Sequence, residues 1–579
     1  MSTTTFPALA TGRRTPNLWD LLTLLCVFGA LIAVVHVTPD TFKPLDAPNA
    51  TSVDLDPTRL PEYALRTTMR MFAALAASLV FTFTFAPLAA KSRRAGLVMV
   101  PMLDILQSVP ILGFLSFTTA FFMGLFPGQV AGLEFAAIFA IFTSQAWNMA
   151  FSFYQSLTTL PADLDEVTKS FRLTGWQRFW RLEVPFGMPG LVWNMMLSMS
   201  GGWFFVVASE AITLGDANWK LPGIGSFVAL ALEKRDIGAI FYAIAAMLIV
   251  IILYDQFLFR PLVAWSAKFR FEIVASARGE DPWVLKLLRR THVLRVMGDR
   301  LGDALGAIGT LRLALPAGWP GLGRREAATK PSRLGDIVFL AIVALAAAAA
   351  IWRIVEYIVS HDVGLSDLGE TLLLGCVTLL RVVVLITLAS LIWVPIGVWI
   401  GLRPNWARRI QVAAQFVAAF PANLLFPIFV IAIVYFHVSA DIWLTPLMIL
   451  GTQWYILFNV IAGASAFPGD MREAASSFHV GGWLWWRKII LPGIFPYYVT
   501  GAITASGGSW NAAIVAEVAT WGNTKLEAHG LGAYIARATD AGDFPRIVLG
   551  VVVMSMFVLA FNRILWRPLY TYATRRLTL

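Results

Sequence analysis

The stretch Pro468–Pro492, PGDMREAASSFHVGGWLWWRKIILP, repeats a stretch found 307 residues earlier, Pro161–Pro185, PADLDEVTKSFRLTGWQRFWRLEVP. The two stretches agree in their terminal prolines, one glutamate, one phenylalanine and a Gly-Trp pair. Agreement at the same displacement continues downstream: Pro189 as Pro496, Trp203 as Trp510, Glu210 as Glu517, Gly223 and Gly225 as Gly530 and Gly532, Asp236 as Asp543, and Arg260-Pro261-Leu262 as Arg567-Pro568-Leu569. A displacement of 311 relates two upstream pairs: Arg70 to Arg381, and Pro110 to Pro421. The sequence therefore predicts two copies of one module.

The composition predicts that both copies lie in a membrane. Of 579 residues, 58% are hydrophobic and 14% are charged, whereas soluble domains have about 45–50% and about 25%. This balance excludes a soluble enzyme, a disordered chain and a nucleic-acid-binding protein, although the net charge is +10. Cys26 and Cys376 both lie in apolar stretches and predict no disulfide framework.

Each copy contains six apolar runs close to the ~20 residues that a helix needs to cross a bilayer. The first run follows Arg13 and Arg14 but is too long for a signal peptide, so we expect it to remain as a span. The expected spans are 17–38, 70–90, 100–123, 131–155, 188–212, 237–258, 335–358, 381–402, 411–436, 442–463, 494–519 and 545–566.

The loops between these runs alternate between basic and acidic. Loop 359–370, for example, has three acidic residues and no Lys or Arg. The positive-inside rule then predicts that both termini are cytoplasmic. An even number of spans per copy makes the copies parallel. We therefore expect an all-α integral membrane fold of two tandem six-helix modules, related by a pseudo-two-fold axis along the membrane normal.

The modules are expected at 1–259 and 335–579, with a linker at 260–334 between them. From Arg260 to Arg333 the chain has 14 basic and 6 acidic residues, which predicts a cytoplasmic linker. Two interpretations of this linker stay open: an amphipathic helix near 283–305 that lies on anionic headgroups, and a solvated tether.

The repeated stretches, about 161–185 and 468–492, are the least apolar parts of the modules. Their first prolines suit the start of a helix, and their last prolines oppose the continuation of a second one. Two short amphipathic helices at the membrane surface are predicted in each copy. Their tryptophans could serve as interfacial anchors, but that interpretation does not explain the recurring glutamate.

Both stretches resemble the EAA loop of ABC-importer permeases, a coupling helix that docks in a groove of a cytoplasmic ATPase. That pattern is Glu-Ala-Ala, three residues, Gly, nine residues, a β-branched residue, one residue and Leu-Pro. Arg172 and His479 stand at the glycine position, and Val167-Thr168 replaces the alanine pair in the first copy. The positions that match are Glu473, Ala474, Ala475, Ile489, Leu491 and Pro492 in the second copy, and Glu166 and Pro185 in the first. The resemblance implies these ATPase-coupling residues: Glu166, Phe171, Gly175, Pro185, Glu473, Ala474, Ala475, Phe478, Gly482 and Pro492.

The segments Trp203–Glu210 and Trp510–Glu517 resemble the Trp-x6-Glu stretch of nitrate/sulfonate/taurine-type permeases. The two resemblances imply a fused permease of a type I ABC importer in a bacterial inner membrane, and not an enzyme. The sequence has no Gly-x4-Gly-Lys-Ser/Thr phosphate loop, so two partner ATPase domains would use the ATP and Mg. An extracytoplasmic solute-binding protein would deliver a small anion: nitrate, bicarbonate, or a sulfonate such as taurine. Membrane lipid would be a further partner, and no cofactor or nucleic acid is expected on this chain.

Polar residues inside the spans could line the solute pathway or serve as hydrogen-bonding contacts between helices. Two of them, Glu210 and Glu517, could instead lie in the outer interface beside a basic partner. Arg70 and Arg381 are expected to snorkel to that interface or to attract an anion. Paired carboxylates, a metal-ligand cluster and a nucleophile triad do not stand out, so no catalytic residue or metal site is predicted. The pathway candidates are Gln145, Ser198, Trp203, Glu210, Gln453, Ser506, Trp510, Asn511 and Glu517.

Alternative functions stay open at this point. A secondary carrier with parallel repeats would take up solute without an ATPase and would usually have acidic residues in the middle of spans. A non-transporting membrane scaffold would not depend on Glu166 and Glu473. Each of these two carboxylates could also pair with a local Lys or Arg instead of contacting an ATPase.

Overall fold

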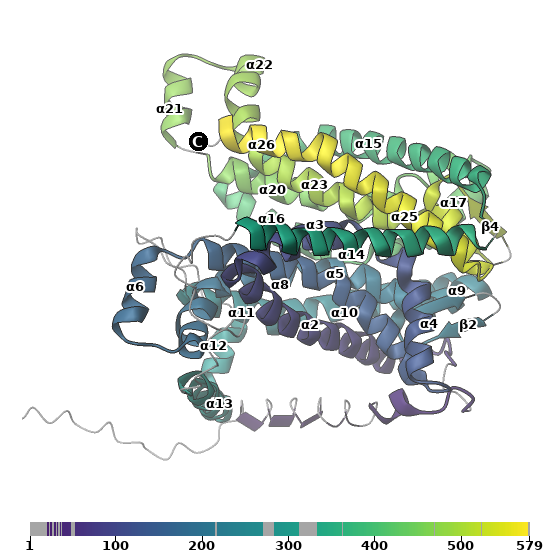
Figure 1. The fold of residues 1–579 in the computed structure, drawn as a ribbon, viewed down its shortest axis with the longest axis horizontal. Coiled ribbons are helices and arrows are strands. Elements are labelled where there is room, and N and C mark those ends of the chain that lie inside the picture. Colours follow the sequence, from purple (N-terminus) through teal and green to yellow (C-terminus); the bar gives the residue numbers. More distant parts are fainter. Residues whose placement is uncertain are drawn as a thin grey trace, which may run out of the picture.

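The computed structural model describes residues 20–576 except 22–23, 26–27, 30–31, 33–34, 36–37, 48–51, 215–216, 270–282, 312–332, 362, 468 and 523. Figure 1 shows two helical bundles side by side, the N-terminal one in purple and blue and the C-terminal one in green and yellow. The only strands in these described residues form two short hairpins. Most of the expected first span, 17–38, and much of the linker lie outside the described residues.

The first module contains ten named helices and one hairpin within the described residues. In chain order they are α2 (Leu60–Lys91), α3 (Arg93–Ser108), α4 (Leu115–Leu125), α5 (Val130–Thr158), α6 (Ala162–Ser170), α7 (Gly175–Arg178), α8 (Val184–Glu210), β1 (Ala211–Leu214), β2 (Ala217–Lys220), α9 (Ile224–Lys234), α10 (Ile237–Tyr254) and α11 (Arg260–Ser266).

The second module repeats this order after the linker helices α12 (Trp283–Arg290) and α13 (His292–Thr310). Its elements are α14 (Arg333–Val359), α15 (Leu365–Gly401), α16 (Pro404–Ala419), α17 (Phe426–Phe436), α18 (Ala440–Trp443), α19 (Leu447–Leu450), α20 (Trp454–Ser465), α21 (Gly469–Ser477), α22 (Gly482–Trp485), α23 (Leu491–Ala516), β3 (Val518–Trp521), β4 (Thr524–Glu527), α24 (Leu531–Asp540), α25 (Phe544–Phe561) and α26 (Arg567–Arg576).

The repeat extends to irregular features of the backbone. Among the described residues each module has two π-helical turns, and those of the second module lie 307 residues after those of the first: Phe179–Glu183, Asp255–Phe259, Trp486–Ile490 and Asn562–Trp566. A proline follows each turn by two residues. Because a proline ring clashes with the carbonyl four residues earlier, a π turn lets the helix continue past it. The expectation that Pro185 and Pro492 interrupt the helix is therefore wrong: Gly175–Glu210 and Gly482–Ala516 are each continuous.

The helices confirm a multi-pass membrane protein. Eight helices among the described residues are long and apolar enough to cross a membrane, or ten if each of two bent helix pairs is one span. The pair formed by α3 and α4, expected as one span at 100–123, is bent by 88°. The pair that covers 442–463 is bent by 45°. The expected span 411–436 is also divided, into α16 and α17.

Prolines explain two of these breaks. Pro110 follows α3 and Pro421 follows α16, at positions that the repeat relates to each other. Each proline introduces a short 3-10 turn, Leu112–Phe114 in the first module and Ala422–Leu425 in the second. Leu112 is packed in the hydrophobic core of the second module, and Leu424 in that of the first. The broken spans therefore interlock the two modules.

Candidate functional site

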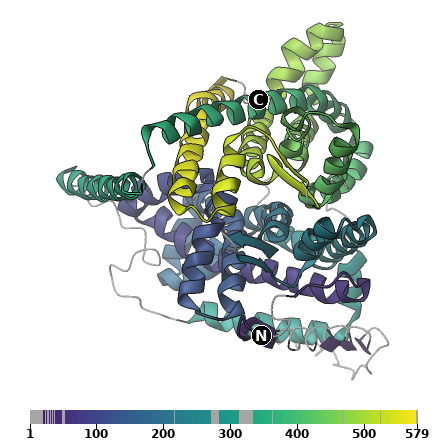
Figure 2. The same cartoon turned by 90° about the vertical axis from the view of Figure 1, so that its right-hand side faces the viewer.

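The two repeated stretches project from the same end of the molecule. Figure 1 shows α6 beyond the blue bundle and α21 with α22 beyond the green one, both on the left. The β1–β2 and β3–β4 hairpins lie at the opposite end, which faces the viewer in Figure 2. This arrangement agrees with two parallel modules, and it presents two similar helical surfaces side by side.

Each projecting surface exposes the repeated glutamate and the repeated phenylalanine. Glu166 and Glu473 are exposed, and neither forms an ion pair with another described residue. Phe171 is 75% exposed and Phe478 is 80% exposed. A large apolar side chain at such exposure beside a free carboxylate is typical of a surface that binds another protein. The alternative that these two glutamates pair with a local Lys or Arg finds no contact to support it among the described residues.

The glycine position of the EAA pattern has an unusual backbone in this chain. Arg172 and His479 both adopt left-handed conformations, with φ of 49° and 53°. The next amide in each loop bonds back to the helix: Leu173 N to Thr168 O at 3.1 Å, and Val480 N to Ala475 O at 2.9 Å. This is the Schellman ending of a helix, in which glycine is the least strained residue. The departure from glycine therefore leaves the loop geometry in place.

An ion-pair chain connects the first loop to the membrane-spanning bundle. Asp165 Oδ1 lies 2.5 Å from Arg178 NH1, and Arg178 Nε lies 3.1 Å from Glu183 Oε1. The other carboxylate oxygen of Glu183 lies 2.8 Å from Lys91 Nζ, at the end of α2. Glu183 is buried, so the chain joins α6, the π turn and α2 through charges that water hardly screens.

The second loop lacks this ion-pair chain. Its four counterpart positions hold Leu402, Arg472, Trp485 and Ile490. Ile490 is fully buried in the second core, and Leu402 and Trp485 pack against that core. The two loops are therefore joined to their modules by different chemistry. This difference was not predicted, although the positions where the aligned copies differ in charge are a sequence signal for it.

The end of the linker helix α13 contacts the first loop. Gln177 Nε2 donates to the carbonyl of Thr310 at 2.9 Å. Gly309 lies against Trp180, so that a Cβ at this glycine would be 3.2 Å from the tryptophan Cβ. One of the two interpretations left open for the linker was an amphipathic helix near 283–305. The structure has two helices there, α12 and α13, and the end of α13 contacts the first loop.

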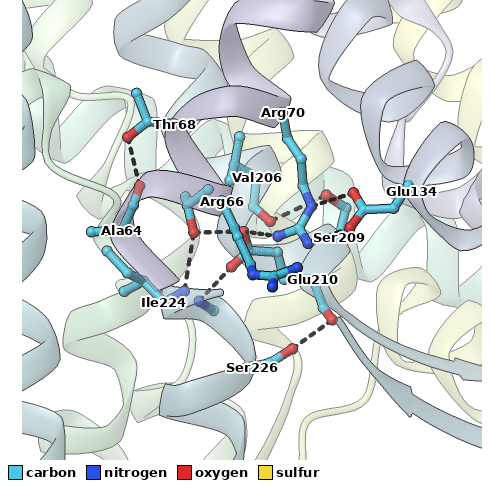
Figure 3. Close-up of polar contacts among 12 residues, drawn as sticks. Ala64, Arg66, Thr68, Arg70, Glu134, Val206, Ser209, Glu210, Ile224 and Ser226 are labelled. Carbon is cyan, nitrogen blue, oxygen red and sulfur yellow. Dashed lines mark hydrogen bonds and ion pairs between the residues drawn. The ribbon is translucent and has the colours of Figure 1, made fainter. Parts of the chain in front are cut away.

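A buried polar cluster connects three helices near the hairpin end of the first module. Figure 3 shows Arg70 of α2 between Glu134 of α5 and Glu210 of α8. The guanidinium donates twice to Glu134, at 2.6 and 2.7 Å, and once to Glu210, at 2.7 Å. Glu210 also accepts from Thr67 Oγ1 and from the Gly225 amide, both at 2.7 Å. Gly223 is required beside it, because a Cβ there would lie 2.3 Å from the Glu210 carboxyl carbon.

The second module repeats this cluster in a more open form. Arg381 lies 3.1 Å from Glu517 and 3.1 Å from Asp441. Glu517 is 1% exposed, but the Asp441 side chain is 43% exposed and also contacts His529. The expectation that Arg70 and Arg381 snorkel is wrong, because both guanidinium groups are paired within their own modules. Glu210 and Glu517 do have the expected basic partner, in the protein interior instead of the outer interface.

One pathway candidate lies at the contact between the modules. Asn511 of α23 accepts from the Ile111 amide at 2.6 Å, across the interface. On the other side, Asn423 Nδ2 donates to the carbonyl of Phe204 of α8 at 3.1 Å. Phe204 and Asn511 are counterparts in the repeat, so the two contacts obey the pseudo-symmetry. Asn423, two residues after the repeated Pro421, was not among the predicted pathway residues.

The other pathway candidates contact residues of their own modules. Gln145 Nε2 lies 3.0 Å from Met71 Sδ, and Gln453 accepts from Trp393 Nε1 at 2.9 Å. The rings of Trp203 and Trp510 pack on Tyr254 and Phe557. Ser198 and Ser506 are buried. All of these residues stay predictions as contacts of a solute. In the described part of the chain, no group of three His, Cys, Asp or Glu side chains is placed to hold a metal ion.

Comparison with known proteins identifies similar sequences in both modules. The family described as binding-protein-dependent transport system inner membrane component matches residues 67–260 and 393–577. The nitrate import permease protein NrtB of Leptolyngbya laminosa is 25% identical over 185 residues, which are 32% of this chain and 63% of that protein. The bicarbonate transport system permease protein CmpB of Synechococcus elongatus is 26% identical over 186 residues, 32% of this chain and 64% of that protein.

A third relative is named for a different kind of solute. The glycine betaine/carnitine transport permease protein GbuB of Listeria monocytogenes is 28% identical over 197 residues, 33% of this chain and 63% of that protein. The chain thus spans less than two thirds of the length of each of these relatives. Each match involves about a third of this chain, as expected if a relative corresponds to one of the two modules.

Proposed function

Because this chain belongs to the family of binding-protein-dependent transport system inner membrane components, we propose that it is the permease subunit of an ATP-driven importer whose loops at 161–185 and 468–492 dock two cytoplasmic ATPase domains. Members of this family are membrane subunits of transport systems and not enzymes, and the ATPase activity lies in separate subunits. The modules would be residues 1–259 and 335–579, with both termini on the ATPase side of the inner membrane. A solute-binding protein would dock at the hairpin end.

The observation that supports this proposal most directly is the pair of projecting surfaces. Two similar surfaces on one chain suit two similar partners. The free carboxylates of Glu166 and Glu473 would pair with basic groups of each ATPase, and Phe171 and Phe478 would fill apolar grooves. Rigid connection of each loop to its module would convert ATPase closure into movement of the spans.

The test is purification of the tagged full-length chain from its native cells in mild detergent, with mass spectrometry of the proteins that co-purify. Two copies of an ATPase per chain are expected. The double variant Glu166→Arg and Glu473→Arg should lose at least about tenfold of the bound ATPase, because a like charge replaces each pairing carboxylate at the interface. The matched control is Glu233→Arg, which changes an exposed carboxylate on α9 near the hairpins.

Two results would overturn the proposal. The first is a chain that purifies without ATPase and still accumulates solute in vesicles under an ion gradient, which is the behaviour of a secondary carrier. The second is equal ATPase recovery from the wild type and the double variant, which would place the docking surface elsewhere.

We infer that the solute is a small anion, on the support of the Trp-x6-Glu segments and the nitrate and bicarbonate relatives. A zwitterionic quaternary ammonium compound is the second candidate, favoured by the glycine betaine/carnitine relative. Uptake of labelled nitrate, bicarbonate, taurine and glycine betaine by native cells with and without this chain separates the two. Loss of uptake of glycine betaine alone would contradict the anion assignment.

A further inference from the structure

A basic hollow lies on α26, at the end from which α21 and α22 project (Figure 1). Its volume is about 550 Å³, and it is lined by Arg563, Arg567, Pro568, Thr571, Tyr572 and Arg575. The three arginines follow each other at intervals of four and eight residues, so they lie on one face of the helix. None of them forms an ion pair with another described residue. Like charges at this spacing repel each other, which favours a bound counter-anion.

On the equivalent face of the first module, the arginine is paired within the chain and the linker makes a contact. Asp255 Oδ2 accepts from Arg260 Nε at 2.9 Å, so the arginine there has its own carboxylate. Gln256 Oε1 accepts from Trp283 Nε1 of the linker helix α12 at 3.0 Å, and the Trp283 ring packs on Phe257. The linker therefore occupies part of this face, and Arg260 already has a carboxylate partner.

Two residue differences in the second module remove the carboxylate beside the arginine and the residue that bonds to the linker. Asn562 stands in the place of Asp255, so Arg567, the counterpart of Arg260, has no carboxylate beside it. Arg563 stands in the place of Gln256 and adds a second positive charge where the linker is bound in the first module. Arg575 replaces Lys268 and keeps the third charge. The second face is thus open and basic because of differences at defined positions.

The surroundings indicate what kind of anion would bind. The helix Phe544–Ala573 is long and apolar enough to cross a membrane, and the hollow lies at its end. Ile564, next to Arg563, is 77% exposed, as is usual for a side chain that faces lipid tails. Arginine binds phosphate through two parallel N–H groups, and basic pockets at membrane boundaries bind lipid headgroups.

We propose that this hollow binds the phosphate of an anionic phospholipid, held by Arg563, Arg567 and Arg575 on the second module alone. On the corresponding face of the first module, Asp255 pairs with Arg260 and the linker helix α12 bonds to Gln256, so we expect no equivalent site among the residues described there. The proposal does not depend on the solute or on the partner ATPases, since it concerns only the lipid boundary of α26.

The test measures lipid retention by native mass spectrometry of the full-length chain in detergent, titrated with phosphatidylglycerol or with phosphatidylcholine. Phosphatidylglycerol should be retained in preference to phosphatidylcholine. The double variant Arg563→Gln and Arg567→Gln should bind it about fivefold more weakly for each arginine removed. Asn562→Asp keeps all three arginines and restores the internal carboxylate, so it should also weaken retention by about fivefold. A double variant of two exposed basic residues outside the hollow, Arg487→Gln and Lys488→Gln, is the control and should leave retention unchanged.

Each contrary outcome has a defined meaning. Equal retention of the two lipids would overturn the proposal. An equal loss of lipid retention in the Arg487→Gln and Lys488→Gln control would mean that diffuse charge attraction explains the retention. That result would also overturn the proposal. Displacement of the lipid by glycerophosphate or inorganic phosphate at similar concentration would identify a site for a free anion instead of a lipid. Retention unchanged in Asn562→Asp would show that the guanidinium of Arg567 does not contact the phosphate.

Discussion

At the scale of single residues, the buried arginines show how the modules combine charge with an apolar interior. Arg70 is bonded to two carboxylates on two different helices, and its side chain is 3% exposed. Loss of one member of such a group leaves the other charges buried without compensation, which costs far more than loss of a surface pair. The repeat supplies an internal comparison, because Arg381 is in the same position with the partly exposed partner Asp441.

We expect Arg70→Met to lower the free energy of unfolding by about 3–5 kcal/mol and Arg381→Met by about 1–3 kcal/mol. The difference arises because water can solvate Asp441 but not Glu134 after the arginine is removed. Thermal unfolding in detergent measures both, with Arg353→Met as the control for an exposed ion pair. Equal destabilisation by the two variants would mean that the second cluster is as well shielded from water as the first.

Arg70, Glu210 and their counterparts could be singled out from the sequence, but the ion pairs that connect them could not. Glu134 was overlooked although Asp441 follows it by the same 307 residues as the other repeats. A pair of acidic residues at equivalent positions in two apolar spans is a signal that can be read without a structure. The partner of each residue could not be predicted, because pairing depends on how α2, α5 and α8 pack in three dimensions.

At the scale of elements, the projecting loops show which local features follow from sequence. Two short helices were expected in each of the stretches 161–185 and 468–492, and the structure confirms the first of each pair, α6 and α21. The continuity of α8 and α23 with these loops was not expected, since a proline ordinarily ends a helix. The π turns that make it possible depend on the backbone geometry around each proline, which the residue types alone do not reveal.

The left-handed residues of the loops give a prediction for local stability. Arg172→Gly and His479→Gly remove a clash between Cβ and the backbone that costs roughly 1 kcal/mol at positive φ. Hydrogen exchange at the Leu173 and Val480 amides should therefore slow by about fivefold. Gly482→Ala is the opposing control, because Gly482 has φ of 58° and a Cβ there is strained. Faster exchange in the two glycine variants would argue against the left-handed conformation.

At the scale of the whole molecule, the broken spans interlock the modules. Each module inserts the turn after its repeated proline into the core of the other. The hydrogen bonds that cross the contact include those from Ile111 to Asn511 and from Asn423 to Phe204. The repeat predicted two modules related by one axis. Hydropathy could not distinguish the broken spans from continuous ones, because apolar residues flank both prolines.

This interlocking predicts that the covalent linker is dispensable for assembly. Co-expressed chains 1–320 and 321–579 should co-purify at a ratio of one to one. Adding Asn423→Ala and Asn511→Ala should weaken their association by about fivefold for each lost hydrogen bond, each worth about 1 kcal/mol. Asn459→Ala, whose amide bonds within its own helix, is the control. Two halves that purify separately as stable monomers would contradict the interlocked interface.

The two loops are joined to their modules by different contacts, and this difference affects which mutations the chain can accept. When one gene product occupies both positions of a homodimer, a mutation must be acceptable in both places at once. Here the Asp165–Arg178–Glu183–Lys91 chain exists in one loop, and Leu402, Trp485 and Ile490 stand in the other. Each loop can therefore accumulate its own mutations. Because both loops belong to one chain, every molecule contains one loop of each kind.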